Sequence, residues 1–252
     1  MFTQHITHEE IEALPYVAFG GKITIVDKPE KVAAAVSHLM QEKLLGYDTE
    51  TRPNFTRGVH YRISLVQLSS ADRAFLFRID KIGIPKELLE LLQNGQVLKI
   101  GVAINDDIQG MQRIRAFKPQ GFVDLQKITE AYGIEDKALK KIAAIVLNLR
   151  ISKSQQTSNW AALRYTAEQK LYAATDAWVC REIYLKLKES NPQLIALPQP
   201  EKAKNDAEIK AAGSSKYKNR RKKRQGKISI IRKAQQKAGA LSPANLQHPH
   251  NQ

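Results

Sequence analysis

The sequence predicts an α/β domain with a mixed β-sheet and helices on both faces, followed by a basic and largely disordered tail. Segments that alternate like strands are interspersed with segments that have helical spacing. Three strand-like segments before the first crossover helix indicate an antiparallel meander, and the strand–helix alternation after it indicates strands added in parallel. Charge then divides the chain near Pro200.

The elements follow one another along the chain in a regular order. The predicted strands are short and apolar, and cover residues 22–26, 44–49, 61–68, 73–77, 97–101 and 121–124. The predicted helices carry apolar residues three and four positions apart, and cover residues 29–43, 85–92, 106–116, 125–132, 139–147 and 167–188. Pro85 stands at the first turn of its helix, where proline is favoured.

The charge distribution predicts where the domain ends. Residues 201–252 hold 14 Lys/Arg, 3 Asp/Glu and a single aromatic residue, Tyr217, so this part cannot bury much surface. Proline residues mark the junction before it. We therefore predict an N-terminal extension over residues 1–21, a folded domain over residues 22–200, and a largely disordered basic tail over residues 201–252.

The bulk composition indicates the chemical class of the partner and the cellular compartment. The 252 residues carry a net charge of +15, which favours an anionic partner, with nucleic acid ahead of a membrane surface. The single cysteine, Cys180, excludes an internal disulfide and a cysteine-rich zinc site, and fits a reducing, cytoplasmic location. No apolar run of about 18 residues and no signal-peptide pattern is present, so no membrane association is expected.

Three acidic clusters are candidates for a metal site. Asp48 and Glu50 are two residues apart near a strand end, so both side chains face one way, and a divalent cation would offset their repulsion. Asp107 follows Asp106 where a helix is expected to start; we assign Asp106 as the helix cap and Asp107 as the ligand. The alternatives are an acidic turn for the first cluster and two caps for the second.

The third cluster lies on the last predicted helix. Tyr172 and Asp176 are four residues apart and therefore share one helix face. This spacing places a phenol and a carboxylate on the same patch. The alternative is a buried tyrosine that is bonded to an aspartate one turn further on.

Together these motifs resemble a known family. DTE, INDD and YAATD, in this order, resemble the DEDD superfamily of 3′–5′ exonucleases, and SNWAALRYTAEQKLYAATDAWVCREIY is similar to ribonuclease D and to the Werner-syndrome-type exonuclease domain. The resemblance covers roughly residues 22–190. It implies a ribonuclease H-like (DnaQ-like) fold. Tyr172 matches the DEDDy subclass, whereas Leu171 stands where the DEDDh subclass has histidine.

The resemblance also implies roles for individual residues. Asp48, Glu50, Asp107 and Asp176 would bind two divalent ions, Mg²⁺ or Mn²⁺, and Tyr172 would orient or deprotonate the attacking water. Thr49 would contact the terminal nucleotide through its backbone. Independently of the resemblance, Trp160 in SNW is interpreted either as a wall on which bases stack or as a side chain that packs the last helix onto the sheet.

The function that this resemblance implies is metal-dependent 3′–5′ hydrolysis of single-stranded RNA or DNA, with release of nucleoside 5′-monophosphates. The alternative is a non-catalytic adaptor that binds nucleic acid on the same fold. Intact acids argue against the adaptor, because binding alone does not need them.

Overall fold

The computed structural model describes residues 2–53 and 62–195. The predicted tail and the first residue of the strand expected at 61–68 lie outside these ranges. The described strands are β1 (Lys22–Val26), β2 (Leu44–Thr51), β3 (Ile63–Ser69), β4 (Arg73–Arg78), β5 (Leu98–Gly101) and β6 (Phe122–Asp124).

The described helices surround this sheet. The first half of the chain contributes α1 (His8–Glu12), the 3₁₀ helix η1 (Pro29–Lys31), α2 (Val32–Leu39), α3 (Ile79–Ile82) and α4 (Lys86–Leu92). The second half contributes α5 (Ile104–Ile114), α6 (Leu125–Ala131), α7 (Leu139–Leu147), α8 (Ala167–Ser190) and the 3₁₀ helix η2 (Pro192–Leu194). None of these helices combines the length and the apolar content needed to cross a bilayer.

The six strands form one mixed sheet in the order β1-β4-β3-β2-β5-β6. Strands β2, β3 and β4 are the antiparallel meander that the sequence predicts. Strands β5 and β6 are added in parallel beside β2, and β1 pairs in parallel with β4 at the other edge. The predicted mixed sheet is therefore confirmed.

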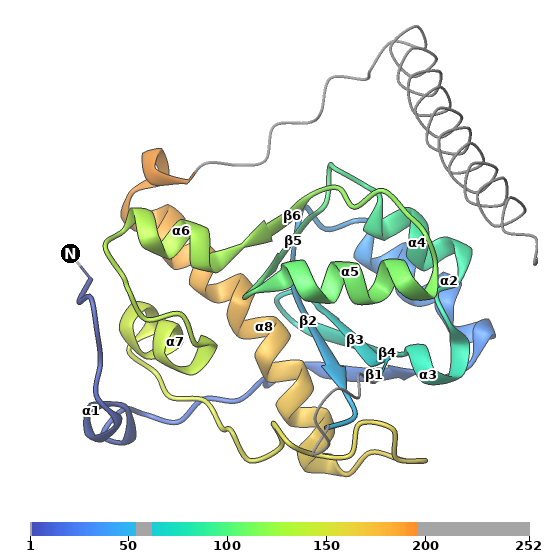
Figure 1. Cartoon of the computed structure of the whole chain (residues 1–252), viewed down its shortest axis with the longest axis horizontal. Coiled ribbons are helices and arrows are strands. Elements are labelled where there is room, and N and C mark those ends of the chain that lie inside the picture. The colour runs from blue at the N-terminus through green and yellow to red at the C-terminus, as the bar shows by residue number, and fades with distance from the viewer. Residues whose placement is uncertain (1, 54–61, 196–252) are drawn as a thin grey trace, which may run out of the picture. The chain divides into compact units, whose positions relative to one another are not determined.

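Helices cover both faces of the sheet, as predicted (Figure 1). One face carries Tyr47, Val66 and Phe77, which pack in a single apolar cluster with residues of α2, α4 and α5. On the other face Leu65 and Leu76 pack against α8, the long helix that runs across the sheet in Figure 1. Alternate residues of β2 consequently belong to different faces, and this decides which of them reach the site.

Two predicted helix boundaries need correction. The helix expected over residues 29–43 ends at Leu39, after a 3₁₀ turn at Pro29–Lys31. Helix α5 begins at Ile104, two residues before the predicted start, and its N-cap is Ala103 in a left-handed conformation with φ of 55°. Asp106 is therefore inside the first turn, and no side chain caps this end of the helix. The Ala103 amide donates instead to Asp124 Oδ1 at 3.1 Å, so a side chain from the end of β6 holds this turn.

Candidate active site

The site lies at the end of β2, beyond the point where its neighbour stops. Strand β5 pairs with β2 only at residues 44–46. The following residues Asp48, Thr49 and Glu50 therefore have a neighbouring strand, β3, on one side only. The register of β2 against β3 shifts directly after Glu50, which ends the regular pairing at the site. This opening allows helices α5 and α8 to approach the same strand end.

A glycine brings α8 onto this strand. Gly46 faces α8, and a Cβ atom placed on it would lie 1.7 Å from the carbonyl oxygen of Ala177. Only glycine therefore permits this contact between a strand and a helix backbone. Because Asp176 precedes Ala177, the contact places Asp176 beside Asp48. Gly46 was not among the predicted site residues, although it lies two positions before Asp48 and on the same face of the strand.

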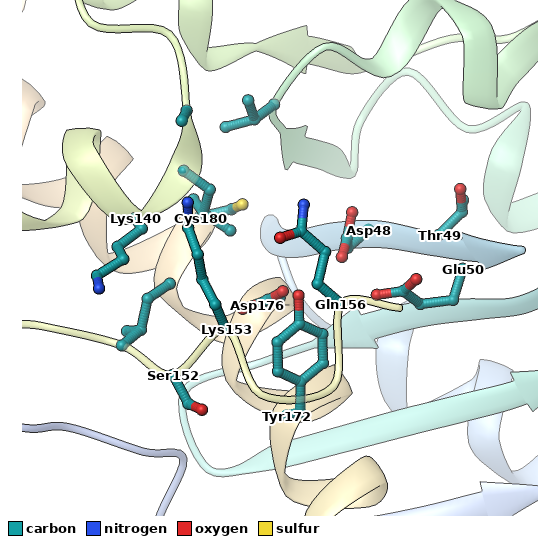
Figure 2. A pocket seen from close by; sticks show the side chains of 14 residues that line it. Asp48, Thr49, Glu50, Lys140, Ser152, Lys153, Gln156, Tyr172, Asp176 and Cys180 are labelled. Atoms are coloured by element: carbon teal, nitrogen blue, oxygen red, sulfur yellow. The ribbon is translucent and has the colours of Figure 1, made fainter. Parts of the chain in front are cut away.

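Three of the predicted acids meet in one cluster. Asp48, Glu50 and Asp176 each offer a carboxylate oxygen, and these three oxygens lie within 4.8 Å of one another. Figure 2 shows Asp48 and Glu50 on β2, with Asp176 and Tyr172 approaching from α8. Oδ1 of Asp176 is buried and has no hydrogen-bond partner in the described part of the chain.

The fourth acid stands apart from this cluster. Asp107 lies on the first turn of α5, and its Oδ1 accepts a hydrogen bond from the Thr49 hydroxyl at 2.7 Å. The Thr49 side chain thus links Asp107 to the strand between Asp48 and Glu50. The predicted contact between the Thr49 backbone and a nucleotide stays a prediction.

The electrostatics of the cluster favour a bound cation. Burial and the charges of Asp176 and Asp107 raise the pKa of Asp48 well above its usual range. Burial and the neighbouring carboxylates raise the pKa of Glu50 to about 10, and burial raises the pKa of Asp176 to about 7. Burial also raises the pKa of Asp107 to about 6, against the hydrogen bond from Thr49. Crowded carboxylates with an unpaired buried oxygen are a donor set that fits a hard divalent ion.

Tyr172 points into the same space. Its ring packs on one side against Trp160, with the ring centres 6.0 Å apart. Burial and the charges of Asp176 and Glu50 raise the pKa of its phenol. The phenol therefore keeps its proton at neutral pH in the metal-free protein.

The structure corrects the assignment of Trp160 to substrate binding. Its side chain is completely buried and packs with Leu65, Leu76 and Ala173. The ring has no free face for a base, so the alternative, a tryptophan that packs the last helix onto the sheet, is the one found. Trp160 contributes to the site by supporting the Tyr172 ring.

A cavity of about 320 Å³ opens in front of the acids, and its far wall carries basic and polar side chains. Lys153 and Gln156 lie on the loop after α7, and Lys140 lies on α7 itself (Figure 2). None of these three residues was predicted from the sequence. Lysines are spread along the whole chain, and nothing local distinguishes the two that line this cavity; the Lys140 ammonium is moreover paired with Glu12 at 2.7 Å.

A buried amide beneath the acids was also missed. Gln67 on β3 stands opposite Asp48 in the strand register, so the two side chains share the α8 face of the sheet. Gln67 is completely buried, and neither its amide nitrogen nor its amide oxygen has a partner among the described residues. Its position in SLVQL, on an otherwise apolar strand, was the available signal.

Comparison with known proteins identifies the family. The family model described as 3′–5′ exonuclease matches residues 23–191. The chain belongs to this 3′–5′ exonuclease family. The motifs that resemble the DEDD superfamily fall inside the match.

Individual relatives of the exonuclease domain agree with this. The chain is 31% identical over 184 residues to the mouse bifunctional 3′–5′ exonuclease/ATP-dependent helicase WRN. This match covers 69% of this chain and 13% of that protein. The EXO domain of Aedes aegypti Nibbler has the same fold, with a TM-score of 0.62, 24% identity, and coverage of 68% of this chain and 89% of that chain.

A structure with RNA is also similar in fold. Trypanosoma brucei RNase D in complex with RNA U12 has a TM-score of 0.59 and 22% identity to this exonuclease domain, covering 68% of this chain and 62% of that chain. At this level of identity the likeness establishes the fold.

Proposed function

We propose that the chain hydrolyses single-stranded nucleic acid from its 3′ end and releases nucleoside 5′-monophosphates, using two divalent ions, Mg²⁺ or Mn²⁺. The observation that carries this proposal is the meeting of Asp48, Glu50 and Asp176 at one strand end, with Tyr172 beside them. Membership of the 3′–5′ exonuclease family supports it.

The acids have separate places in the proposed mechanism. Asp48, Glu50 and Asp176 would hold a first ion, and Asp107, which accepts a hydrogen bond from Thr49, would contribute to a second. Bound there, the ions would supply an activated water and stabilise the leaving 3′ oxygen. Thr49 keeps Asp107 in place through the hydrogen bond between their side chains.

The remaining residues position the water and the strand. A protonated Tyr172 phenol can orient the water that attacks phosphorus, while the bond from phosphorus to the 3′ oxygen of the preceding nucleotide breaks. Lys153, on the opposite wall of the cavity, would offset the charge of the scissile phosphate. The products are a nucleoside 5′-monophosphate and a strand with a new 3′ hydroxyl.

The activity is tested with 5′-labelled single-stranded RNA and DNA oligomers in Mg²⁺ or Mn²⁺. We expect a ladder of products that shorten from the 3′ end, and we expect EDTA to abolish it. The same experiment shows which sugar is preferred. Tight, salt-sensitive binding of both oligomers without any hydrolysis would contradict the proposal and favour the non-catalytic adaptor.

Replacing Tyr172 by phenylalanine is expected to slow hydrolysis by about 100-fold or more, because the attacking water loses the group that orients it. The metal ligands stay in place, so Mn²⁺ binding, measured by calorimetry, should be unchanged. Tyr184→Phe, on the same helix and two turns beyond Asp176, is the matched control and should hydrolyse at the wild-type rate. Equal rates for the two variants would remove Tyr172 from the mechanism.

Replacing Lys153 by alanine is expected to weaken binding of the oligomer and to reduce the dependence of log affinity on log salt by about one, as for the loss of one phosphate contact. Lys188→Ala is the control, since this exposed lysine lies on α8 about 18 Å along the helix from Asp176. Affinity is measured by fluorescence anisotropy over a range of salt concentrations. A Lys153→Ala protein with the salt dependence of Lys188→Ala would exclude the contact.

A further inference from the structure

The N-terminal extension forms part of the wall of the site, although residues 2–19 lie outside the part of the chain that the family model matches. Residues 15–17 run along the loop after α7. The Arg150 amide donates to the Pro15 carbonyl at 2.9 Å, and the Val17 amide donates to the Arg150 carbonyl at 2.9 Å. This parallel bridge joins the extension to the loop that carries Ser152 and Lys153.

Side chains hold the extension at further points. Arg150 Nε donates to the Leu14 carbonyl at 3.0 Å, and Lys140 Nζ donates to Glu12 Oε1 at 2.7 Å. Further along, the Phe19 amide donates to the Thr175 hydroxyl at 3.0 Å in a buried contact. Thr175 directly precedes Asp176. Figure 1 shows the extension passing below α7 and reaching α8 before it enters β1.

This fixed extension places a tyrosine ring beside the reacting groups. A second hollow of about 110 Å³ is lined by Tyr16, Ser152, Leu171, Tyr172 and Asp176, among others. Tyr172, Asp176 and Ser152 also line the main cavity, so the two hollows adjoin at the acids. Tyr16 is 51% exposed, and the Arg150 guanidinium lies 5.5 Å from its ring centre.

An exposed aromatic ring in this position has a chemical use. A ring whose backbone is held by hydrogen bonds loses little conformational entropy when a base stacks on it. Base–aromatic stacking tolerates any base and contributes roughly 1–3 kcal/mol for each base. Trp160, which was expected to stack, is buried, whereas Tyr16 presents a half-exposed ring in the second hollow, which adjoins the main cavity.

We propose that Tyr16 stacks on a base of the bound strand, within one nucleotide of the scissile phosphate. This inference rests on the proposed function, because it takes the strand to cross the acids. It adds a nucleotide-binding residue outside the matched exonuclease domain. The extension then contributes directly to substrate binding, in addition to closing one wall of the site.

The test compares full-length wild type, Tyr16→Ala and Tyr16→Phe. Each protein binds three fluorescent single-stranded oligomers without added metal: one intact, one with an abasic terminal nucleotide and one with an abasic penultimate nucleotide. Stacking predicts that one abasic substitution weakens wild-type binding by about tenfold. It also predicts that Tyr16→Ala binds the intact oligomer about tenfold more weakly and does not respond to that substitution. Tyr16→Phe should behave as wild type.

Two outcomes would overturn the proposal. Tyr16→Ala with wild-type affinities would show that the ring is not used. Equal weakening on intact and abasic oligomers would show that Tyr16 acts only through the structure of the wall. Binding is measured without catalysis, so the two proposals fail separately. Base-dependent binding without hydrolysis would retain the stacking role of Tyr16 and reject the exonuclease activity. Hydrolysis together with binding that does not depend on the base at Tyr16 would retain the exonuclease activity and reject the role of Tyr16.

Discussion

Replacing Asp48 by asparagine is expected to abolish hydrolysis and also to raise the thermal stability of the metal-free protein. Loss of a central ligand removes several kcal/mol of stabilisation of the transition state, which corresponds to about a thousandfold or more in rate. The gain in stability has a separate, electrostatic origin. Asparagine keeps the shape of aspartate but removes one charge from a cluster in which burial and two further carboxylates oppose ionisation.

The effect of pH on this variant has a definite sign. The folded-state pKa of Asp48 lies above its usual value of 3.8, so the folded protein holds this proton more tightly than the unfolded chain. The resulting stability is present below about pH 4 and is lost as pH rises through the folded-state pKa. The melting temperature of Asp48→Asn should therefore exceed that of wild type by a margin that grows as pH rises above 4.

Thermal melting in EDTA at several pH values measures this margin. Added Mn²⁺ should raise the melting temperature of wild type and have much less effect on the variant, because the ion binds the folded state. Asp136→Asn is the control with the opposite sign. Asp136 accepts hydrogen bonds from Lys141 and from the Ile6 amide, which outweigh burial and hold its pKa below the usual range. A destabilised Asp48→Asn protein would contradict the electrostatic account of the site.

Replacing Gly46 by alanine is expected to destabilise the protein by about 3 kcal/mol or more and to abolish hydrolysis. The added Cβ would lie 1.7 Å from the carbonyl oxygen of Ala177 and 2.6 Å from its carbonyl carbon. A backbone group within a long helix cannot move alone, so α8 must shift away from β2. Asp176 would move with it and leave the acid cluster.

Gly20→Ala is the matched control, because a Cβ at Gly20 meets no atom within 4 Å. Its stability should stay within about 0.5 kcal/mol of wild type. Urea denaturation measures both variants, and a Mn²⁺ titration shows whether the ion site survives. A Gly46→Ala protein with wild-type stability and wild-type Mn²⁺ affinity would show that α8 is not held against β2 by this contact.

Two pairs of site residues follow directly from local geometry. The side chains of a strand alternate between two faces, so Asp48 and Glu50 had to point the same way wherever β2 lay. Residues four apart on a helix share a face, so Tyr172 and Asp176 had to do so as well. The order of the motifs DTE, INDD and YAATD also indicated the family, because all three occur together in the sequence.

Sequence reasoning was wrong where two explanations had the same local pattern. Trp160 follows Ser158 and Asn159 in SNW, a pattern that agrees equally with a stacking surface and with a buried anchor. Only the packing of α8 on the sheet decided for the anchor. Asp106 precedes an apolar helical repeat, as a cap does. Asp124, at the end of β6, accepts the hydrogen bond from the Ala103 amide and holds that turn instead.

The sequence by itself determined the sheet order within the meander, the pairing of acids on shared faces, and the family. Only the tertiary structure decided that Gly46 is the contact for α8, that Gln67 lies opposite Asp48, that Lys153 lines the cavity in front of the acids, and that Tyr16 lines the adjoining hollow. The physical reason is the range of the interactions. Periodicity is set by backbone geometry over a few residues, whereas these four placements depend on close packing between segments far apart in the chain.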